Sequence, residues 1–394
     1  MKQIIVFFFF LLSFFVANAQ DAPVIVGAEC TKGYFPLLKN KRLAVLSNQS
    51  GMVGKEHLVD LIHRKGFNIV AIFSPEHGFR GNADAGEEVS SSVDEKTGIP
   101  IRSLYEGKSG KPGEEVMKSF DMLIVDMQDV GLRFYTYYAT MTRMMDACAE
   151  YGLKVIILDR PNPNGFYVDG PILDVKYKSG VGWLPIPIVH GMTLGELALM
   201  VNGEKWLTDG RTCDVAVIKC KNYTHQTKYK LPSPPSPNLP NMKSVYLYPS
   251  TCFFEATPVS LGRGTSLPFE VYRHPNMLGY SYSFIPKSIP GAKNPPQLDK
   301  LCYGVDLSQL PDEVIWKNGV DLSYLIDAYK NLNLGDHFFR PFFELLVGRD
   351  YVRKMIIAGK SANEIKATWQ EDVVKFKKQR APYLLYDESL TPNP

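Results

Sequence analysis

The sequence predicts an α/β protein, with a Rossmann-like parallel sheet followed by a second, smaller α+β domain at the carboxyl end. Between about residues 40 and 220, apolar strand-like runs alternate with helical patterns, which is typical of a parallel sheet with right-handed crossovers. Three of these runs lead directly into clusters of charged and polar residues. Beyond about residue 230 the alternation stops and the periodicity becomes less regular.

The first nineteen residues predict a secretory signal. Lys2 precedes an apolar run over residues 4–16, and Ala17-Asn18-Ala19 is a small-x-small cleavage sequence. The alternative is an uncleaved membrane anchor, but the apolar run is shorter than the ~20 residues that a spanning helix needs. No cysteine follows the cleavage sequence, which argues against a lipoprotein anchor. We therefore expect an exported protein, periplasmic or secreted, with no stable membrane insertion after the signal is removed.

The charge argues against a nucleic-acid-binding protein, and the cysteine spacing argues against a structural zinc site. The formal net charge of +3 gives no basic excess of the kind that nucleic-acid binding requires. Hydrophobic residues make up 45% of the chain, which permits a large core. The six cysteines could form disulfides in an exported protein, but they lack the spacing of a structural zinc site. Cys148 lies among apolar helix positions, so we expect it to be a buried thiol.

The elements expected in the first half follow one another in βα order. A strand over residues 43–47 precedes a helix over residues 58–64, in which the apolar residues fall at helical spacing. Further strands are expected over residues 68–73, 122–125, 154–158 and 215–218. The last three follow helical patterns over residues 116–120, 141–151 and 194–201. Thr193 and Glu196 have the spacing of a capping box at the start of the last helix, with His190 just ahead of it and facing the cleft.

The second half begins with a segment rich in proline. Residues 231–240 contain five prolines, which favour a stiff, extended conformation. This segment could be a linker, but it looks more like a rigid wall that presents Asn238 to a cleft. We expect a signal over residues 1–19, a Rossmann-like catalytic domain over residues 20–240 and a carboxy-terminal domain over residues 241–394 that completes the cleft. A final helical stretch is expected over residues 362–378.

The three polar clusters are expected to meet in one cleft, because ligands of open α/β sheets bind outside the carboxyl ends of the strands. The clusters carry Glu76, Asp126, Asp129 and Asp159. Several carboxylates in one cleft suit glycoside hydrolysis, in which a protonated carboxyl assists the leaving oxygen. A structural ion pair is the alternative for Asp129 with the nearby Arg133, and likewise for Asp159 with the adjacent arginine.

Glu76 stands apart from the other carboxylates. It follows a buried-looking strand and a proline, and it lies near His77 and two glycines. Glycine permits close approach of a ligand, and low exposure would raise the pKa of the carboxyl towards the range that proton donation requires. The alternative is a carboxylate that caps a helix or tethers a loop. The histidines are too scattered to predict a metal site.

An aromatic segment suits the binding of a sugar, and a glycine-rich segment suits the binding of an anion. Residues 134–138 are mostly aromatic, and flat rings pack on the apolar faces of pyranoses, although ordinary core packing is an equal alternative. Residues 262–265, with Arg263 between two glycines, resemble an anion-binding turn. No G-x-G-x-x-G motif opens the first βα turn, so a nicotinamide oxidoreductase is a distant alternative and no cofactor is expected.

Six motifs together resemble one family. They are SPEHGFRG (residues 74–81), QDVGLRFYTY (128–137), LDRPNPNG (158–165), HGMTLGE (190–196), PSPNLP (235–240) and SLGRGTSLPFE (260–270). In this order they are similar to the DUF1343 family, which is associated with exo-β-N-acetylmuramidases of the NamZ type, and the resemblance covers nearly the whole mature chain. It implies a Rossmann-like domain and a smaller carboxy-terminal domain with the site between them. It also implies removal of N-acetylmuramic acid from the non-reducing end of peptidoglycan fragments.

The resemblance implies that Glu76 is the catalytic acid. We group His77, Asp126, Asp129 and His190 with it as catalytic candidates. The substrate-binding candidates are Arg80, Gln128, Arg133, Tyr135, Tyr137, Asp159, Arg160, Asn162, Asn238, Glu255, Arg263, Thr265 and Glu270. Arg263 is the first choice to hold the lactyl carboxylate that distinguishes muramic acid from glucosamine, with Arg80, Arg133 and Arg160 as competitors. The expected partner is a peptidoglycan-derived glycan, and the main alternative function is a non-catalytic glycan-binding protein of the cell wall.

Overall fold

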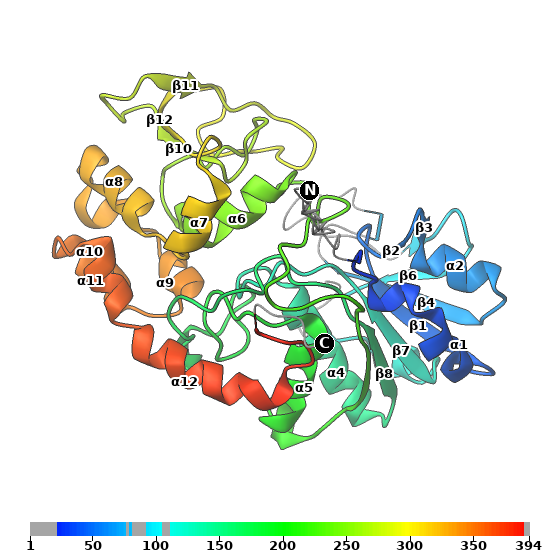
Figure 1. The fold of residues 1–394 in the computed structure, drawn as a ribbon. Coiled ribbons are helices and arrows are strands. Elements are labelled where there is room, and N and C mark those ends of the chain that lie inside the picture. The colour runs from blue at the N-terminus through cyan, green and yellow to red at the C-terminus, as the bar shows by residue number, and fades with distance from the viewer. Residues whose placement is uncertain (1–21, 76–78, 81–91, 105–110, 390–394) are drawn as a thin grey trace, which may run out of the picture.

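A seven-stranded sheet lies at the centre of the first half of the molecule (Figure 1). The computed structural model describes residues 22–75, 79–80, 92–104 and 111–389. The strand order is β5-β6-β4-β1-β7-β8-β9, and only β5 runs antiparallel to its neighbour. The bounds are β1 Leu43–Ser47, β4 Ile69–Ser74, β5 Ser92–Val93, β6 Pro100–Ser103, β7 Met122–Asp126, β8 Lys154–Leu158 and β9 Asp214–Ile218.

The six parallel strands have the order of a Rossmann fold. Numbered along the chain, they read 3-2-1-4-5-6 across the sheet, so the order reverses between β1 and β7. Strand β1 pairs with β4 on one side and with β7 on the other, both in parallel. Loops that follow β1 and β7 therefore diverge at this point, which is where open sheets of this kind bind ligands.

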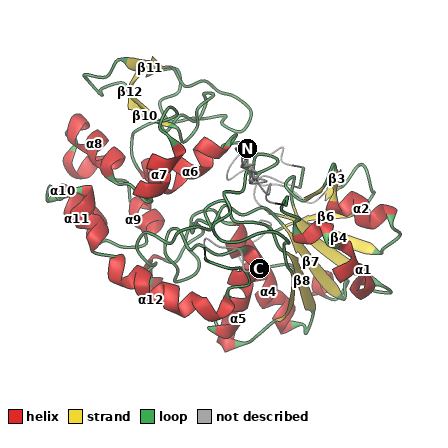
Figure 2. Cartoon of the chain, viewed as in Figure 1, coloured by secondary structure: helices red, strands yellow, loops and turns green. Residues whose placement is uncertain are grey.

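Helices cover both faces of the sheet (Figure 2). Leu43 and Val45 of β1 pack with α1 (Thr31–Leu38) and α2 (Leu58–Arg64), whereas Ala44 and Leu46 pack in the cluster that includes α4 (Tyr137–Glu150) and α5 (Leu194–Gly203). The short helix α3 (Glu114–Met117) contributes Met117 to that second cluster. Burial on both faces explains why these strands are continuously apolar in the sequence.

The second half combines helices with a small antiparallel sheet. Its strands have the order β10-β12-β11, with bounds β10 Val271–His274, β11 Tyr282–Phe284 and β12 Cys302–Asp306. Its helices are α6 Met242–Thr251, α7 Asp312–Asn318, α8 Ser323–Leu332, α9 Phe342–Val347, α10 Tyr351–Ile357, α11 Ala362–Ala367 and α12 Gln370–Arg380. The predicted fold class, a Rossmann-like domain with a smaller α+β domain, is confirmed. The proposed boundary at residue 240 stays a prediction.

Several predicted elements are confirmed in their bounds, and others are not. Strands β1 and β8, helix α2 and the capping box of Thr193 with Glu196 agree with the sequence. The helix expected over residues 116–120 is α3, which ends at Met117, and α4 starts four residues earlier than expected. A hairpin of β2 (Met52–Val53) and β3 (Glu56–His57), between β1 and α2, was not predicted.

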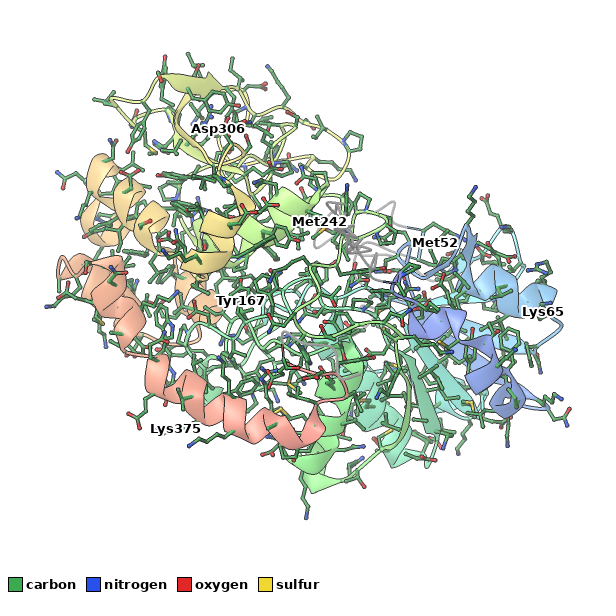
Figure 3. All side chains as sticks on the ribbon, viewed as in Figure 1. Met52, Lys65, Tyr167, Met242, Asp306 and Lys375 are labelled. Carbon is green, nitrogen blue, oxygen red and sulfur yellow. The ribbon has the colours of Figure 1, made fainter. Side chains whose placement is uncertain are left out.

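The final helical stretch is two helices. Helices α11 and α12 are separated at Trp369, whose buried indole donates from Nε1 to Asp169 Oδ1 at 2.8 Å. Helix α12 runs back from the second half to the first, where Tyr383 OH donates to Glu204 beside α5 (Figure 1). Tyr167 lies in the region between the halves and packs against the main core cluster (Figure 3).

The six cysteines are free, and Cys148 is the buried thiol that its surroundings predict. Within the described residues, no helix combines the length and apolar character that crossing a membrane requires.

Candidate active site

Asp126, at the end of β7, is joined to Arg160 rather than open to a cleft. Arg160 donates from Nε to Asp126 Oδ1 at 2.6 Å and from Nη2 to Oδ2 at 3.0 Å. Arg160 Nη2 also reaches the carbonyl of Met52 in the unpredicted hairpin. The Asp126 side chain is fully buried and that of Arg160 is 3% exposed. Two of the candidates therefore neutralise each other and brace the loops around the end of β1.

Asp159 is held by a different set of donors, so the ion pair with Arg160, the alternative to a role in ligand binding, is not formed. Its Oδ2 accepts hydrogen bonds from Thr193 Oγ1 and Tyr386 OH, both at 2.7 Å, and its Oδ1 accepts from Gly195 N at 2.9 Å. Complete burial raises the pKa of this carboxyl to about 6. Asp159 thus joins the start of α5 to the carboxy-terminal tail and lies outside the lining of the cavity described below.

Asp129 and Arg133 are not paired either. Asp129 Oδ1 accepts from Gly131 N at 2.7 Å, while Oδ2 has no hydrogen-bond partner among the described residues. Burial raises the pKa of Asp129 to about 7. Arg133 instead donates to four backbone carbonyls, those of Pro171, Ile186, Leu346 and Val347. Its guanidinium is fully buried, and this burial lowers its pKa to about 10.

The polar residues of the second and third motifs form a network behind the loops. Gln128 donates from Nε2 to the carbonyls of Asp129 and Pro161, at 2.8 and 2.7 Å. Asn162 donates from Nδ2 to the carbonyl of Met192 at 2.9 Å and accepts from Asn164 N. Both side chains are almost fully buried, so they position backbone rather than face a ligand.

His190 is buried behind the same loops, in contrast to its expected place at the cleft. It is 1% exposed and its Nδ1 accepts from Met192 N at 3.3 Å. Burial lowers its pKa to about 3, so the ring is neutral at ordinary pH. Arg80 is also occupied, because its guanidinium binds Asp94 at 2.9 Å and Asp60 at 3.3 Å. Glu76 and His77 lie outside the described residues.

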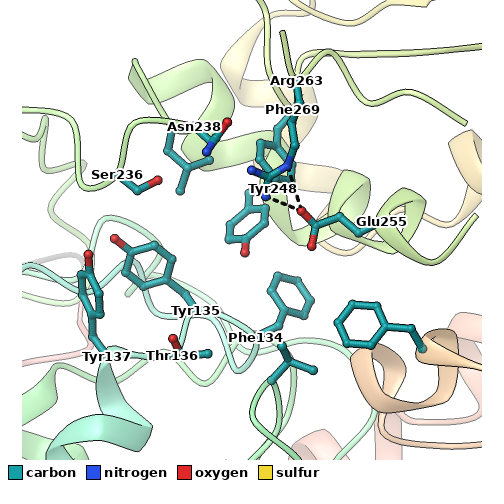
Figure 4. Close-up of a pocket in the computed structure, with 13 residues that line it drawn as sticks. Phe134, Tyr135, Thr136, Tyr137, Ser236, Asn238, Tyr248, Glu255, Arg263 and Phe269 are labelled. Atoms are coloured by element: carbon teal, nitrogen blue, oxygen red, sulfur yellow. Dashed lines mark hydrogen bonds and ion pairs between the residues drawn. The ribbon is translucent and has the colours of Figure 1, made fainter. Parts of the chain in front are cut away.

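A cavity of about 220 Å³ lies between the aromatic loop after β7 and the second half of the chain (Figure 4). Its aromatic lining consists of Phe134, Tyr135, Tyr137, Tyr248, Phe269 and Phe342. Its polar lining consists of Thr136, Ser236, Asn238, Glu255 and Arg263. Five of the predicted binding residues meet here: Tyr135, Tyr137, Asn238, Glu255 and Arg263.

One side of the cavity is the proline-rich segment of residues 231–240, here called the wall segment. The carbonyl of Pro235 accepts from Tyr135 OH at 2.8 Å, from Tyr137 OH at 3.4 Å and from Gln49 Nε2 at 3.1 Å. Asn238 lines the cavity and donates from Nδ2 to the carbonyl of Gly291 at 2.9 Å. The wall segment is thereby fixed to the first half on one side and to the second half on the other.

Two residues expected at the cavity serve the backbone around it. Glu270 was expected to point inward, but it is 2% exposed and accepts from Asn241 Nδ2 at 2.7 Å, near the start of α6. Thr265 donates from Oγ1 to the carbonyl of Gly262 at 2.6 Å and so closes the turn that carries Arg263. No group of three or more His, Cys, Asp or Glu side chains among the described residues could hold a metal ion.

Comparison with known proteins identifies the family. A model of the amino-terminal part of the exo-β-N-acetylmuramidase NamZ matches residues 43–243, and a model of its carboxy-terminal part matches residues 246–386. The chain belongs to the NamZ family. A member of that family, the peptidoglycan β-N-acetylmuramidase NamZ of Bacillus subtilis (strain 168), is 38% identical over 378 residues, which cover 90% of this chain and 89% of the relative.

Two solved structures of DUF1343 proteins from Bacteroides fragilis NCTC 9343 share the NamZ-family fold. One is 71% identical, covers 93% of this chain and all of its own, and superposes with a TM-score of 0.88. The other is 28% identical, covers 92% of this chain and 99% of its own, and has a TM-score of 0.79. The resemblance that the six motifs indicate is therefore confirmed.

The lining of the NamZ-family cavity includes residues that the sequence did not single out. Tyr248 and Phe342 lie outside all six motifs, and each reads as ordinary core in its local pattern, whereas Phe269 lies within the sixth motif but was not named as a binding candidate. Tyr386, which donates to Asp159, lies 227 residues away from it in the chain. No local spacing marks such residues, because only the tertiary fold brings them together.

Proposed function

We propose that this protein is an exo-acting glycoside hydrolase that releases N-acetylmuramic acid from the non-reducing end of peptidoglycan fragments. The observation that carries the proposal is the 38% identity with a peptidoglycan β-N-acetylmuramidase over nearly the full length of both chains. The cavity between the two halves is where we place the substrate.

The shape and lining of the cavity support a single-sugar site. Its volume of about 220 Å³ lies below the ~300–1,000 Å³ of pockets for drug-sized ligands, which suits one sugar ring better than several. Tyr135, Tyr248 and Phe269 supply flat apolar surfaces for a pyranose. Asn238, Glu255 and Arg263 supply the few polar groups that orientation requires.

Glycoside hydrolysis requires an acid that protonates the leaving oxygen, and we assign this role to Glu76. Glu76 follows the last residue of β4 by two positions in the chain. When the glycosidic bond breaks, its oxygen leaves with the proton of Glu76, water adds its hydroxyl to the anomeric carbon, and the remaining proton of water restores the acid. Asp126 does not suit the role of a second free carboxylate, because Arg160 holds both of its oxygens.

We also propose that the protein acts after export. The apolar run and cleavage sequence within the first nineteen residues support a secretory signal, and peptidoglycan lies outside the cytoplasmic membrane. We also propose that the signal ends at residue 19 and that the boundary between the two domains lies at residue 240.

The decisive experiment uses the disaccharide in which N-acetylmuramic acid is β-linked to N-acetylglucosamine. We expect the mature protein to release both sugars, with chromatography as the measurement. Binding of the disaccharide without release of either sugar would favour the non-catalytic glycan-binding alternative. If the protein neither binds the disaccharide nor releases a sugar from it, both functions are rejected.

A further inference from the structure

The cavity contains an ion pair that the proposed reaction does not use. Arg263 donates from Nε and from Nη2 to the same oxygen, Glu255 Oε1, at 3.1 and 2.5 Å (Figure 4). The two side chains are 20% and 23% exposed and both line the cavity. No described residue is hydrogen-bonded to Arg263 Nη1. Glu255 therefore holds one edge of the guanidinium and leaves donors on the other edge for a ligand.

The backbone around Arg263 is built to hold this geometry. Gly262 and Gly264 flank it with φ angles of +90° and +79°, which side chains other than that of glycine rarely adopt. A Cβ atom on Gly262 would lie 2.3 Å from the carbonyl oxygen of Leu267, and one on Gly264 would lie 2.4 Å from that of Lys287. Phe269 packs beside the guanidinium, with Cζ of Arg263 5.2 Å from the ring centroid. The arginine thus projects from a turn with little freedom to move.

The other cationic candidates are occupied elsewhere. Arg133 binds four carbonyls, Arg160 binds Asp126, and Arg80 binds two aspartates. None of the three lines the cavity, whereas Arg263 does. Among the described residues, a ligand carboxylate in this cavity would therefore meet Arg263.

We infer that the Glu255–Arg263 pair selects the acidic sugar, an inference that rests on the proposed function. N-acetylmuramic acid differs from N-acetylglucosamine by a lactyl ether that ends in a carboxylate. Arg263 donates to this carboxylate from its open edge, and Glu255 is a positioning residue that fixes the planar guanidinium in the orientation that the carboxylate requires. Bidentate recognition of this kind depends on geometry, so lysine, a point charge, does not replace arginine.

The test compares two glycosides with the same activated leaving group, one of β-N-acetylmuramic acid and one of β-N-acetylglucosamine. The readout is the ratio of their kcat/KM values within each variant, which does not depend on the fraction of enzyme that is folded. Arg263→Lys is expected to lower kcat/KM for the muramic glycoside about tenfold or more, chiefly through KM, because charge-assisted bidentate bonds are lost. The glucosamine glycoside should change by less than about threefold, since it lacks the carboxylate.

Glu255 is tested by a rescue series. Glu255→Ala frees the guanidinium and should lower the discrimination ratio about as much as Arg263→Lys. Glu255→Gln keeps an acceptor oxygen and should restore part of the ratio. Arg42→Lys is the matched control, because Arg42 also donates from Nε and Nη2 to one carboxylate oxygen, that of Asp121, outside the cavity. Its ratio should equal that of the wild type.

The outcomes separate the inference from the proposed function. If the wild type hydrolyses neither glycoside, the proposed function is wrong. Hydrolysis of the muramic glycoside with an unchanged ratio in Arg263→Lys would overturn the inference alone. A higher ratio in Glu255→Ala would mean that Glu255 competes with the substrate carboxylate instead of positioning Arg263, and would also overturn it.

Discussion

Asp129 is buried without a charged partner, and its raised pKa follows from this burial. Its Oδ1 is bonded to Gly131 N, its Oδ2 has no partner among the described residues, and burial raises its pKa from 3.8 to about 7. Because the folded pKa lies above the unfolded one, the folded state favours the protonated carboxyl. The protonated carboxyl therefore contributes to the free energy of unfolding. This contribution is fully present below the unfolded pKa and is lost as the pH rises towards 7.

Asp129→Asn removes this titration and keeps an oxygen for Gly131 N. We expect its free energy of unfolding, relative to the wild type, to increase by about 1 kcal/mol or more between pH 4.5 and 7.5, since one pKa unit corresponds to ~1.4 kcal/mol. Urea unfolding at both pH values measures the difference. Asp299→Asn is the control, because that exposed carboxylate is paired with Lys287, and its difference should be nearly flat. An equally flat result for Asp129→Asn would contradict the raised pKa.

Glu76→Gln tests the proposed acid, because glutamine keeps the shape of the side chain but cannot donate a carboxylic proton. Turnover of the unactivated disaccharide should fall by ~10²-fold or more, with the fold intact. A glycoside with an activated leaving group needs less protonation, so its turnover should fall by a smaller factor. Near-normal turnover of the disaccharide would reject the assignment.

Among the elements, the loops after β7 depend on Arg133. It joins the loop that carries the aromatic residues to the segment of residues 171–186 and to the end of α9 through four carbonyls at 2.6 to 3.0 Å. Arg133→Met leaves these buried acceptors without donors, so the free energy of unfolding should fall by about 3 kcal/mol or more. Arg42→Met, at an exposed ion pair, should lower the free energy of unfolding far less, because water screens that pair. A comparable loss in both variants would show that Arg133 is not a clamp.

The elements themselves were largely predictable from the sequence. Strands that are buried on both faces appear as continuous apolar runs, and the loops between them mark where each strand ends. The misses are elements that depend on distant contacts. The break between α11 and α12 follows from the contact of Trp369 with Asp169, and the hairpin β2–β3 is braced by Arg160. The local sequence of neither segment predicts these distant partners.

The sequence predicted which loops line the site, but it did not predict which charged side chains bind one another. The aromatic loop, the wall segment and the turn of Arg263 do line one cavity. Asp159 and Arg160, however, are adjacent in the chain and yet bind different partners. Arg160 reaches Asp126 and Asp159 reaches the start of α5, a choice that the spacing alone could not decide.

At the scale of the whole molecule, contacts between the two halves hold the cavity in place. Asp169 in the first half accepts from Trp369 and from Lys366 Nζ at 2.6 Å, and Tyr386 of the tail donates to Asp159. These bonds are largely buried, and buried charge-assisted bonds are the stronger ones. The second half is therefore fastened to the first on the side of α11 and α12 as well as at the wall segment.

This fastening leads to a prediction about where the enzyme cuts. The wall segment closes one side of the cavity, and the carbonyl of Pro235 is held by three donors from the first half. A stiff, prefixed wall loses little entropy when a ligand binds, and we propose that it blocks a glycan from continuing past the terminal sugar. Digestion of a defined glycan chain that begins with N-acetylmuramic acid should therefore release that single sugar first, with the remaining chain shortened by one unit. Early products of several sugar units would instead require an open groove, and the wall segment would then have to lie beside the glycan rather than across its end.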